Sequence, residues 1–225
     1  MKPTPEDDVQ DVATLIGDLV GSRTSMDRAD LHARLGDALA EVNELVTPVR
    51  ALWITAGDEF QGTYATIGAA MQASLLIRLR LAPKYDVRHG IGWGTTTVLD
   101  EAGGIEDGPA WWAARAGIEA AEKAERSASS RSLRTAYVLA EDATGPDPGL
   151  VNACLVLRDE RVSGLSDRSL SVLRGLLSGE TQRDIADSLG ISASAVSQRV
   201  RADGLAALVT AHAMLGDVDG MGGAR

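Results

Sequence analysis

The sequence has few cysteines, histidines and aromatic residues, and each shortage excludes a class of site. Among its 225 residues Cys154 is the only cysteine. This excludes an internal disulfide and a zinc site built from several cysteines, and it fits a reducing cytoplasm. The three histidines are too scattered along the chain to predict a metal cluster. Phe, Trp and Tyr make up only 4% of the residues, which argues against a base-stacking surface for single-stranded nucleic acid.

The sequence also lacks the run of roughly 20 apolar residues that a membrane-spanning helix needs. Its acidic, proline-containing start, residues 1–10, does not have the pattern of a signal peptide. We therefore predict a cytoplasmic protein with no membrane partner. The hydrophobic content of 44% is enough to fill the cores of one ordinary domain and one small domain.

Positive charge is scarce, and the negative excess is uneven along the chain. The sequence has 22 Lys+Arg against 32 Asp+Glu, which gives a net charge of −10. Residues 1–163 account for −9 of this charge and residues 164–225 for only −1. Because an acidic surface repels nucleic acid, we expect any contact with nucleic acid in the second part.

Apolar periodicity in the first part predicts alternating strands and helices. Strands are expected at 12–20, 50–56, 60–65, 87–98 and 134–139, helices at 27–46, 67–81, 111–126 and 150–159, and a glycine-rich acidic loop at 100–109. The order β-α-β-β-α-β followed by α-β predicts an α+β, ferredoxin-like fold in which an antiparallel sheet has helices on one face. The first strand should lie centrally, beside the hairpin made by the second and third.

Two acidic patches follow the predicted strands at one edge of this sheet. Asp18 lies at the end of the first strand, and Asp58 and Glu59 lie in the turn of the hairpin. Magnesium prefers one or two carboxylates together with water and phosphate oxygens, so Asp18 and Asp58 are candidate ligands for Mg²⁺ or Mn²⁺. A structural role stays open, because Asp and Gly suit tight turns and Asp18 alone could cap a loop.

The first part resembles the class III nucleotidyl cyclases and the GGDEF-type diguanylate cyclases. The matching segments, in the family's order, are 16–22, 56–60, 88–94, and Gly108 followed by 113–115. The resemblance implies that Asp18 and Asp58 hold the metal ions and that Arg115 stabilises charge on the transferring phosphoryl group. The candidate ligand-binding set that it implies is Asp18, Leu19, Gly21, Ser22, Asp58, Glu59 and Arg115.

Two positions depart from the cyclase pattern. Trp111 stands where cyclases have an Asn four residues before the helix Arg, and Ile54 stands where a Lys reads the purine. The loss of both groups would remove electrostatic stabilisation of the transition state. We therefore expect a site that binds a nucleotide or phosphate ligand without turning it over. An active metal-dependent cyclase or phosphotransfer enzyme remains the alternative, and a dimerisation scaffold is a third reading.

Residues 166–209 have the spacing of three short helices in a helix-turn-helix. Gly190 suits the tight turn between the second and third helices, and Ser192 suits the N-cap of the third. Ala186 permits a close helix crossing, and Val196 fills the small core. The pattern therefore predicts an all-α module after the sheet domain.

Residues 182–197 resemble the DNA-binding domains of LuxR-type and sigma-region-4-type regulators. Ser194, Ser197, Gln198 and Arg201 are expected at base edges or phosphates, and Thr181, Gln182 and Arg199 at the DNA backbone. Residues 164–210 carry only five Lys+Arg against five Asp+Glu, so a homodimer that doubles the contacts is expected. A protein-interaction role for the three helices remains open.

A cyclase-like domain joined to a helix-turn-helix resembles the SatD family over nearly the full chain. We expect a ligand-sensing domain at 1–163, a DNA-binding domain at 164–212 and a disordered tail at 213–225. The resulting hypothesis is a transcriptional regulator in which a nucleotide or phosphate ligand controls binding to double-stranded DNA.

Overall fold

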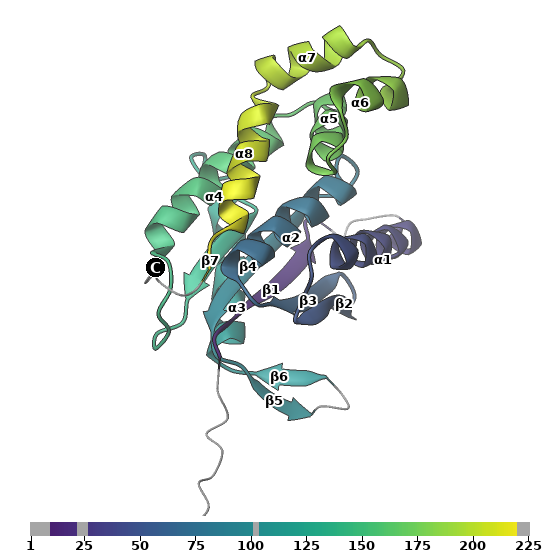
Figure 1. The fold of residues 1–225 in the computed structure, drawn as a ribbon. Helices are drawn as coiled ribbons and strands as arrows, with labels where there is room; N and C mark the ends of the chain where they lie inside the picture. Colours follow the sequence, from purple (N-terminus) through teal and green to yellow (C-terminus); the bar gives the residue numbers. More distant parts are fainter. Residues whose placement is uncertain (1–9, 22–26, 101–103, 220–225) are drawn as a thin grey trace, which may run out of the picture.

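The computed structural model describes residues 10–21, 27–100 and 104–219, which form a mixed α+β fold around a five-stranded sheet (Figure 1). The strands are β1 (Val12–Leu19), β2 (Arg50–Ala56), β3 (Glu59–Tyr64), β4 (Val87–Gly94) and β7 (Thr135–Leu139). They lie in the order β2-β3-β1-β4-β7, and β1 pairs antiparallel with both β3 and β4. The predicted central position of the first strand beside the hairpin is confirmed.

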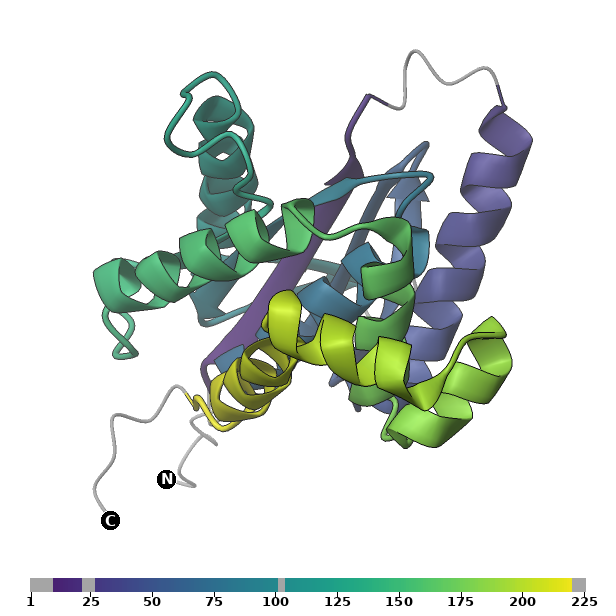
Figure 2. The ribbon, with the colours of Figure 1, turned by 90° about the horizontal axis from the view of Figure 1, so that it is seen from above.

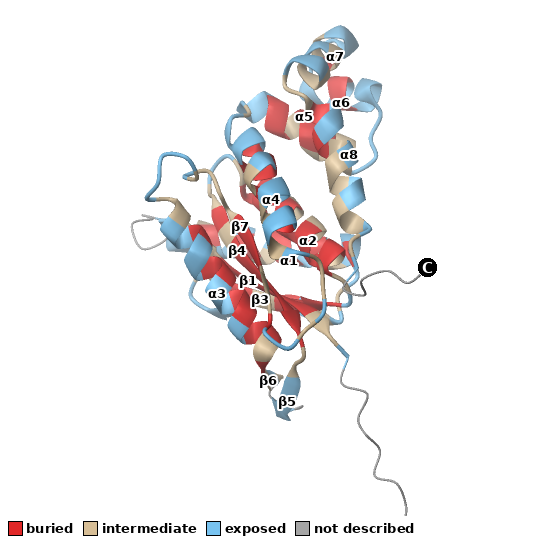
Figure 3. Cartoon of the chain, turned by 90° about the vertical axis from the view of Figure 1, so that its left-hand side faces the viewer, coloured by how far each residue is buried: buried red, intermediate tan, exposed pale blue. Residues whose placement is uncertain are grey.

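Helices cover both faces of the sheet (Figure 3). Leu15 and Leu19 of β1 are buried with α1 (Arg28–Leu45) and α2 (Ile67–Leu81), whereas Ile16 points to the other face and is buried with α3 (Pro109–Ala124). The expectation of helices on one face is therefore wrong. The expectation of a purely antiparallel sheet is also wrong, because β4 and β7 pair in parallel. Parallel neighbours need a long crossover connection, which α3 supplies here.

Two glycines of β4 let α3 lie directly on the sheet. A methyl group on Gly90 would be 2.0 Å from the backbone oxygen of Ala114, and one on Gly92 would be 2.0 Å from that of Ala110. The hydroxyl of Thr14 on β1 also donates to the Ala110 oxygen, at 2.8 Å. The glycines of β4 thus permit a close approach, which fixes the position of α3.

The strand predicted at 87–98 is two strands, and the loop predicted at 100–109 contains a third. β5 (Thr97–Asp100) and β6 (Ile105–Asp107) form a separate antiparallel pair below the main sheet (Figure 1). A strand of only three residues is too short to show the alternation by which strands are recognised in a sequence.

Up to residue 219, where the described part of the chain ends, five helices follow the sheet. They are α4 (Pro148–Ser163), α5 (Asp167–Leu177), α6 (Gln182–Leu189), α7 (Ala193–Ala202) and α8 (Leu205–Gly216). α4 is longer than the predicted helix at both ends. The segment predicted as a tail, 213–225, begins inside α8, and residues 220–225 lie outside the described part of the chain.

The C-terminal helices lie over α2 (Figure 2). Leu75 and Leu79 of α2 share one apolar cluster with Leu173 of α5, Val196 of α7 and Leu208 of α8. α2 therefore packs against the sheet on one side and against the C-terminal helices on the other. No helix within the described ranges is long and apolar enough to span a membrane.

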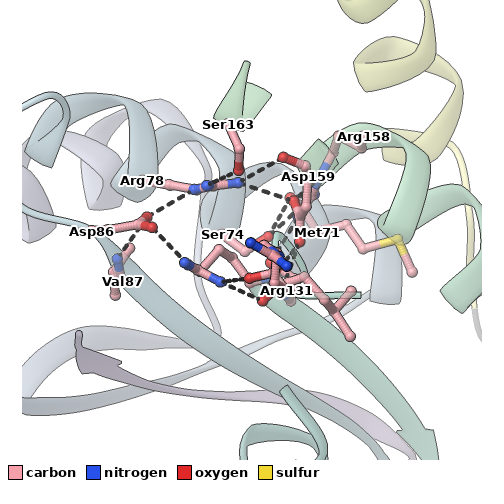
Figure 4. Close-up of polar contacts among 12 residues, drawn as sticks. Met71, Ser74, Arg78, Asp86, Val87, Arg131, Arg158, Asp159 and Ser163 are labelled. Atoms are coloured by element: carbon pink, nitrogen blue, oxygen red, sulfur yellow. Dashed lines mark hydrogen bonds and ion pairs between the residues drawn. The ribbon is translucent and has the colours of Figure 1, made fainter. Parts of the chain in front are cut away.

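A buried ionic network joins α2, α4 and the start of β7 (Figure 4). Asp159 is fully buried and accepts the backbone N–H groups of Arg134 at 2.7 Å and Thr135 at 2.8 Å. Arg158 donates to the same carboxylate at 3.0 Å. Arg78 bridges Asp86 at 3.0 Å and the hydroxyl of Ser163 at 2.8 Å. These bonds tie α4 to the sheet and to α2.

Candidate functional site

Asp18 lies one residue before the end of β1, directly opposite Arg88 of β4. Arg88 donates two hydrogen bonds to it, Nε to Oδ1 at 3.1 Å and Nη2 to Oδ2 at 2.9 Å. Burial raises the pKa of Asp18 above 3.8, the Arg88 cation opposes this rise, and the charges of Asp58 and Glu122 add to it. Gly17 of β1 pairs with Phe60 of β3, so Asp18 and the hairpin turn that carries Asp58 lie at the same edge of the sheet.

Asp58 and Glu59 lie at the tip of the β2–β3 hairpin, after Gly57 with a φ of 64°. Both carboxylate oxygens of Glu59 accept hydrogen bonds from Arg115 of α3, at 3.0 and 2.9 Å. This ion pair raises the pKa of Arg115 above its ordinary value. The helix arginine predicted to stabilise phosphate charge is thus held by a carboxylate of the same site.

One of the two predicted metal ligands, Asp18, has an arginine partner. Both oxygens of Asp18 are occupied by Arg88, so a metal ion would have to displace a cation that is already in place. Within residues 10–21, 27–100 and 104–219, no group of three or more His, Cys, Asp or Glu side chains is placed to hold a metal. The edge also carries two arginines: Arg88 pairs with Asp18 and, at 3.6 Å, with Glu125, and Arg115 pairs with Glu59.

The remaining residues of the predicted ligand-binding set are Leu19, Gly21 and Ser22. The side chain of Leu19 is buried in the core at 2% exposure, so only its backbone can contact a ligand. Gly21 forms the turn after β1, with a φ of 71°. Ser22 lies outside the described residues.

Trp111 and Ile54, the two departures from the cyclase pattern, are packing residues. Trp111 is 7% exposed, lies among Ile16 and Ile118, and its indole N–H has no hydrogen-bond partner in the described part of the chain. Ile54 is half-buried against the main core. The Trp111 indole N–H is buried and Ile54 is apolar, so neither side chain presents a polar group at the surface of the site.

Arg88 is the residue of this site that the sequence analysis missed as a partner of Asp18. The sequence did contain an indication of its orientation. Arg88, Gly90 and Gly92 are spaced two residues apart in one strand, so the Arg88 side chain lies on the same face as the two glycines, the face that α3 covers. Its pairing with Asp18 depends on the β1–β4 register, which the sequence alone does not give.

We expect opposite changes in the pKa of Asp18 when its two charged neighbours are neutralised one at a time. Asp58→Asn should lower this pKa because a like charge is removed, and Arg88→Gln should raise it because the cation is removed. The pKa can be measured by NMR titration of the side-chain carboxyl carbon. Asp37→Asn, in α1, serves as the control, and an unchanged pKa in Asp58→Asn would show that Asp18 and Asp58 are not neighbours.

The structure places α6 and α7 around the tight turn that the sequence predicts. Gly190 has a φ of 63°, and the N–H of Ile191 donates to the oxygen of Ala186 at 3.0 Å. Ala186 and Val196 are buried in the shared cluster. Ser192 caps α7 by accepting the N–H of Ala195, as predicted.

One face of α7 is open to solvent. Ser194, Gln198 and Arg201 are exposed at four- and three-residue spacings, so they lie along one side of the helix. Ser197 is half-buried beside them. Gln182 is exposed at the first residue of α6.

Two residues predicted at the DNA backbone are engaged within the protein. The hydroxyl of Thr181 belongs to a capping box with Asp184. The guanidinium of Arg199 turns toward α5, 3.5 Å from the hydroxyl of Ser166 and 3.4 Å from that of Ser169. These hydrogen bonds stabilise the N-terminal ends of α6 and α5. The exposed polar side of α7 is therefore formed by Ser194, Gln198 and Arg201.

Comparison with known proteins connects this chain to solved structures at low similarity. An adenylate/guanylate cyclase/hydrolase from Silicibacter pomeroyi is 21% identical, with a TM-score of 0.40 over 49% of this chain and 69% of that one. A bacterial light-regulated adenylyl cyclase is 14% identical, with a TM-score of 0.39 over 51% of this chain and 41% of that one. A regulator of polyketide synthase expression from Bifidobacterium adolescentis is 14% identical, with a TM-score of 0.30 over 92% of this chain and 80% of that one.

Comparison with curated proteins gives no match. The SatD family model matches residues 12–215, which include the whole sheet, the Asp18 edge and all of α5, α6 and α7. This match spans most of the sequence, and the chain therefore belongs to the SatD family.

Proposed function

We propose that this protein is a transcriptional regulator that binds double-stranded DNA through α6 and α7. The observation that carries the proposal is the geometry of these helices: Ala186 and Val196 are inside, Gly190 makes the turn, and α7 exposes a polar face. The second helix of a helix-turn-helix lies in the major groove. Gln and Arg side chains suit paired hydrogen bonds to base edges, and Ser suits phosphate.

The charge of this region favours binding as a homodimer. α6 and α7 together carry Arg183, Arg199 and Arg201 against Asp184 and Asp187, so one copy attracts phosphate only weakly. Two copies would engage two half-sites about 34–36 Å apart, one turn of the double helix. The expected operator is therefore a pseudo-palindrome.

Substitutions on the exposed face of α7 test DNA binding. A duplex selected from a random pool should bind the wild-type protein in a salt-sensitive manner, measured by fluorescence anisotropy. Gln198→Ala should weaken binding about 5- to 100-fold and relax the base preference, as the loss of a base contact does. Arg201→Ala should weaken binding and lower the salt slope by about one unit if it contacts phosphate.

Arg126→Ala is the matched control for these variants, because Arg126 is equally exposed but lies just beyond α3, on the sheet side of the molecule. It should bind the duplex like wild type. The proposal is overturned if no duplex is bound in a salt-sensitive manner, or if both α7 variants bind as tightly as wild type.

We also propose that the edge of the sheet around Asp18, Asp58 and Arg115 binds a nucleotide or another phosphate ligand that controls this activity. The support is that Arg88 and Arg115 each hold one carboxylate in a two-bond ion pair. Phosphate suits the same planar donor geometry, so it can replace Glu59 on the partly exposed Arg115. α2 lies between the sheet and the C-terminal helices, which gives such binding a route to α7.

The ligand should bind without turnover, because Trp111 and Ile54 provide no polar group to the reacting phosphate or the base. Radiolabelled nucleoside triphosphates, incubated with Mg²⁺ or Mn²⁺, should give no product above the level of Asp18→Ala. Arg115→Gln should weaken nucleotide binding by about tenfold or more in calorimetry, as expected for a lost charged hydrogen-bond pair.

Arg34→Gln, which also removes an exposed arginine from an ion pair, should bind the nucleotide like wild type. Product made by the wild type and not by Asp18→Ala would establish the alternative, an active cyclase or phosphotransfer enzyme. Absence of nucleotide and phosphate binding would leave the sheet domain as a scaffold and overturn the sensing role.

A further inference from the structure

An apolar groove lies between α4 and α8, which are side by side in Figure 1. Its volume is about 550 Å³. α4 lines it with Cys154 and Leu157, and α8 lines it with Ala207, Ala211 and Met214. Leu157 is 72% exposed and Met214 67% exposed, so large apolar side chains at this groove face solvent.

The groove is hollow because α8 presents alanines at Ala207 and Ala211, where longer side chains would fill the space against α4. From Gly204 to Leu215, α8 borders the groove for about 16 Å at 1.5 Å per residue. The volume lies in the range of about 300–1,000 Å³ that is typical of small-molecule sites. The site is therefore long, narrow and apolar.

One end of the groove carries an arginine without a carboxylate partner. Arg161 donates to the backbone oxygens of Asp203 at 2.8 Å and Ala202 at 3.3 Å, at the C-terminal end of α7. In the described part of the chain no Asp or Glu forms a salt bridge with it. Arg158 also lines the groove, but its charge is balanced by Asp159. Arg161 is thus the cation at this groove that is available to an anion.

We propose that the α4–α8 groove binds a small amphipathic anion, a free medium-chain carboxylate, with its alkyl chain between the helices and its headgroup on Arg161. An arginine fork matches a carboxylate with two hydrogen bonds. A second copy of the chain is a poorer fit, because a stable interface buries about 800 Å² per partner and favours a broad surface over a narrow hollow with one charge at its end. The inference does not depend on the proposed DNA or nucleotide binding.

Cys154 provides a direct test, because it is exposed, lines the groove and is the only cysteine in the chain. Octanoate, decanoate and dodecanoate, kept below micelle-forming concentrations, should each slow the labelling of Cys154 by iodoacetamide in the full-length protein. The concentration for half-protection should fall about fourfold for each added methylene until the groove is filled. Primary alcohols of equal length should protect more weakly because they lack the charge.

Two variants test the two ends of the ligand. Arg161→Gln should raise the half-protection concentration about tenfold for carboxylates and leave that for alcohols unchanged. Ala211→Phe, which fills the groove, should abolish protection by both. Circular dichroism identifies a variant that fails to fold, in which case the other variant and the chain-length series decide.

Four results would overturn the proposal. The first is labelling of Cys154 that no carboxylate concentration slows. The second is a half-protection concentration for carboxylates that is the same in wild type and in a folded Arg161→Gln variant. The third is labelling that slows with protein concentration and gives a Cys154 cross-linked dimer, which would assign the groove to a second copy. The fourth is protection only when the carboxylate is presented in phosphatidylcholine vesicles, which would assign it to a lipid surface.

Discussion

Asp159→Ala is expected to lower the free energy of unfolding by about 3–5 kcal/mol, the cost of removing one partner from a buried ion pair. Asp159 is 0% exposed, and it accepts the backbone N–H groups of both Arg134 and Thr135. Its loss leaves these two amides without an acceptor and leaves the buried guanidinium of Arg158 without its carboxylate. Arg78, 3.6 Å from the same carboxylate, loses part of its charge compensation as well.

Urea unfolding followed by circular dichroism measures this change. Glu160→Ala is the matched control, because it removes an exposed acid at the next position of α4 and should change stability by no more than about 0.5 kcal/mol. Asp159→Asn, which keeps an oxygen acceptor but removes the charge, should fall between them. A loss below about 1 kcal/mol in Asp159→Ala would mean that the network contributes little, contrary to the usual cost of an unpaired buried charge.

The sequence predicts the elements whose ends carry local signals. α2 begins after the Thr66 N-cap and ends at Leu81, before Pro83, so its observed bounds equal the predicted ones. Ser192 caps α7 and Gly190 makes the turn for similar local reasons. Such signals act within a few residues, and a single sequence is enough to read them.

The features that the sequence did not predict depend on contacts between distant segments. Every residue of β4 except Arg88 is buried, so the strand shows no alternation that would reveal helices on both faces. α8 has apolar residues on most of its surface, and its contact with α2 becomes evident only in three dimensions. The parallel pairing of β4 with β7 likewise follows from the position of α3 and not from either strand.

The same distinction applies to the candidate site. The strand order brings Asp18 and Asp58 to one edge, and the sequence was sufficient to predict this. The ion pairs that occupy the site, Asp18 with Arg88 and Glu59 with Arg115, join residues 70 and 56 positions apart. They are set by strand register and by how closely α3 lies on the sheet, which a single sequence does not give. A metal ion held by Asp18 and Asp58 stays a prediction.

The close packing of α3 on the sheet can be tested with Gly92→Ala. This substitution is expected to lower the free energy of unfolding by about 3 kcal/mol, the upper part of the usual cost of overpacking. The new methyl group would be 2.0 Å from the Ala110 oxygen and 2.4 Å from the Ala114 nitrogen. Both are backbone atoms, so no side chain can rotate away. α3 must lift from β4, and Arg115 would then move away from Glu59.

Gly36→Ala makes the same chemical change in α1, where nothing lies within 4 Å of the added carbon. It should raise the free energy of unfolding by about 0.5–1 kcal/mol, because alanine loses less backbone freedom in a helix than glycine does. Urea unfolding of the two variants should therefore give changes of opposite sign. If Gly92→Ala were as stable as Gly36→Ala, α3 would not lie directly on β4. The contact that brings Arg115 of α3 to Glu59 would then have to arise in another way.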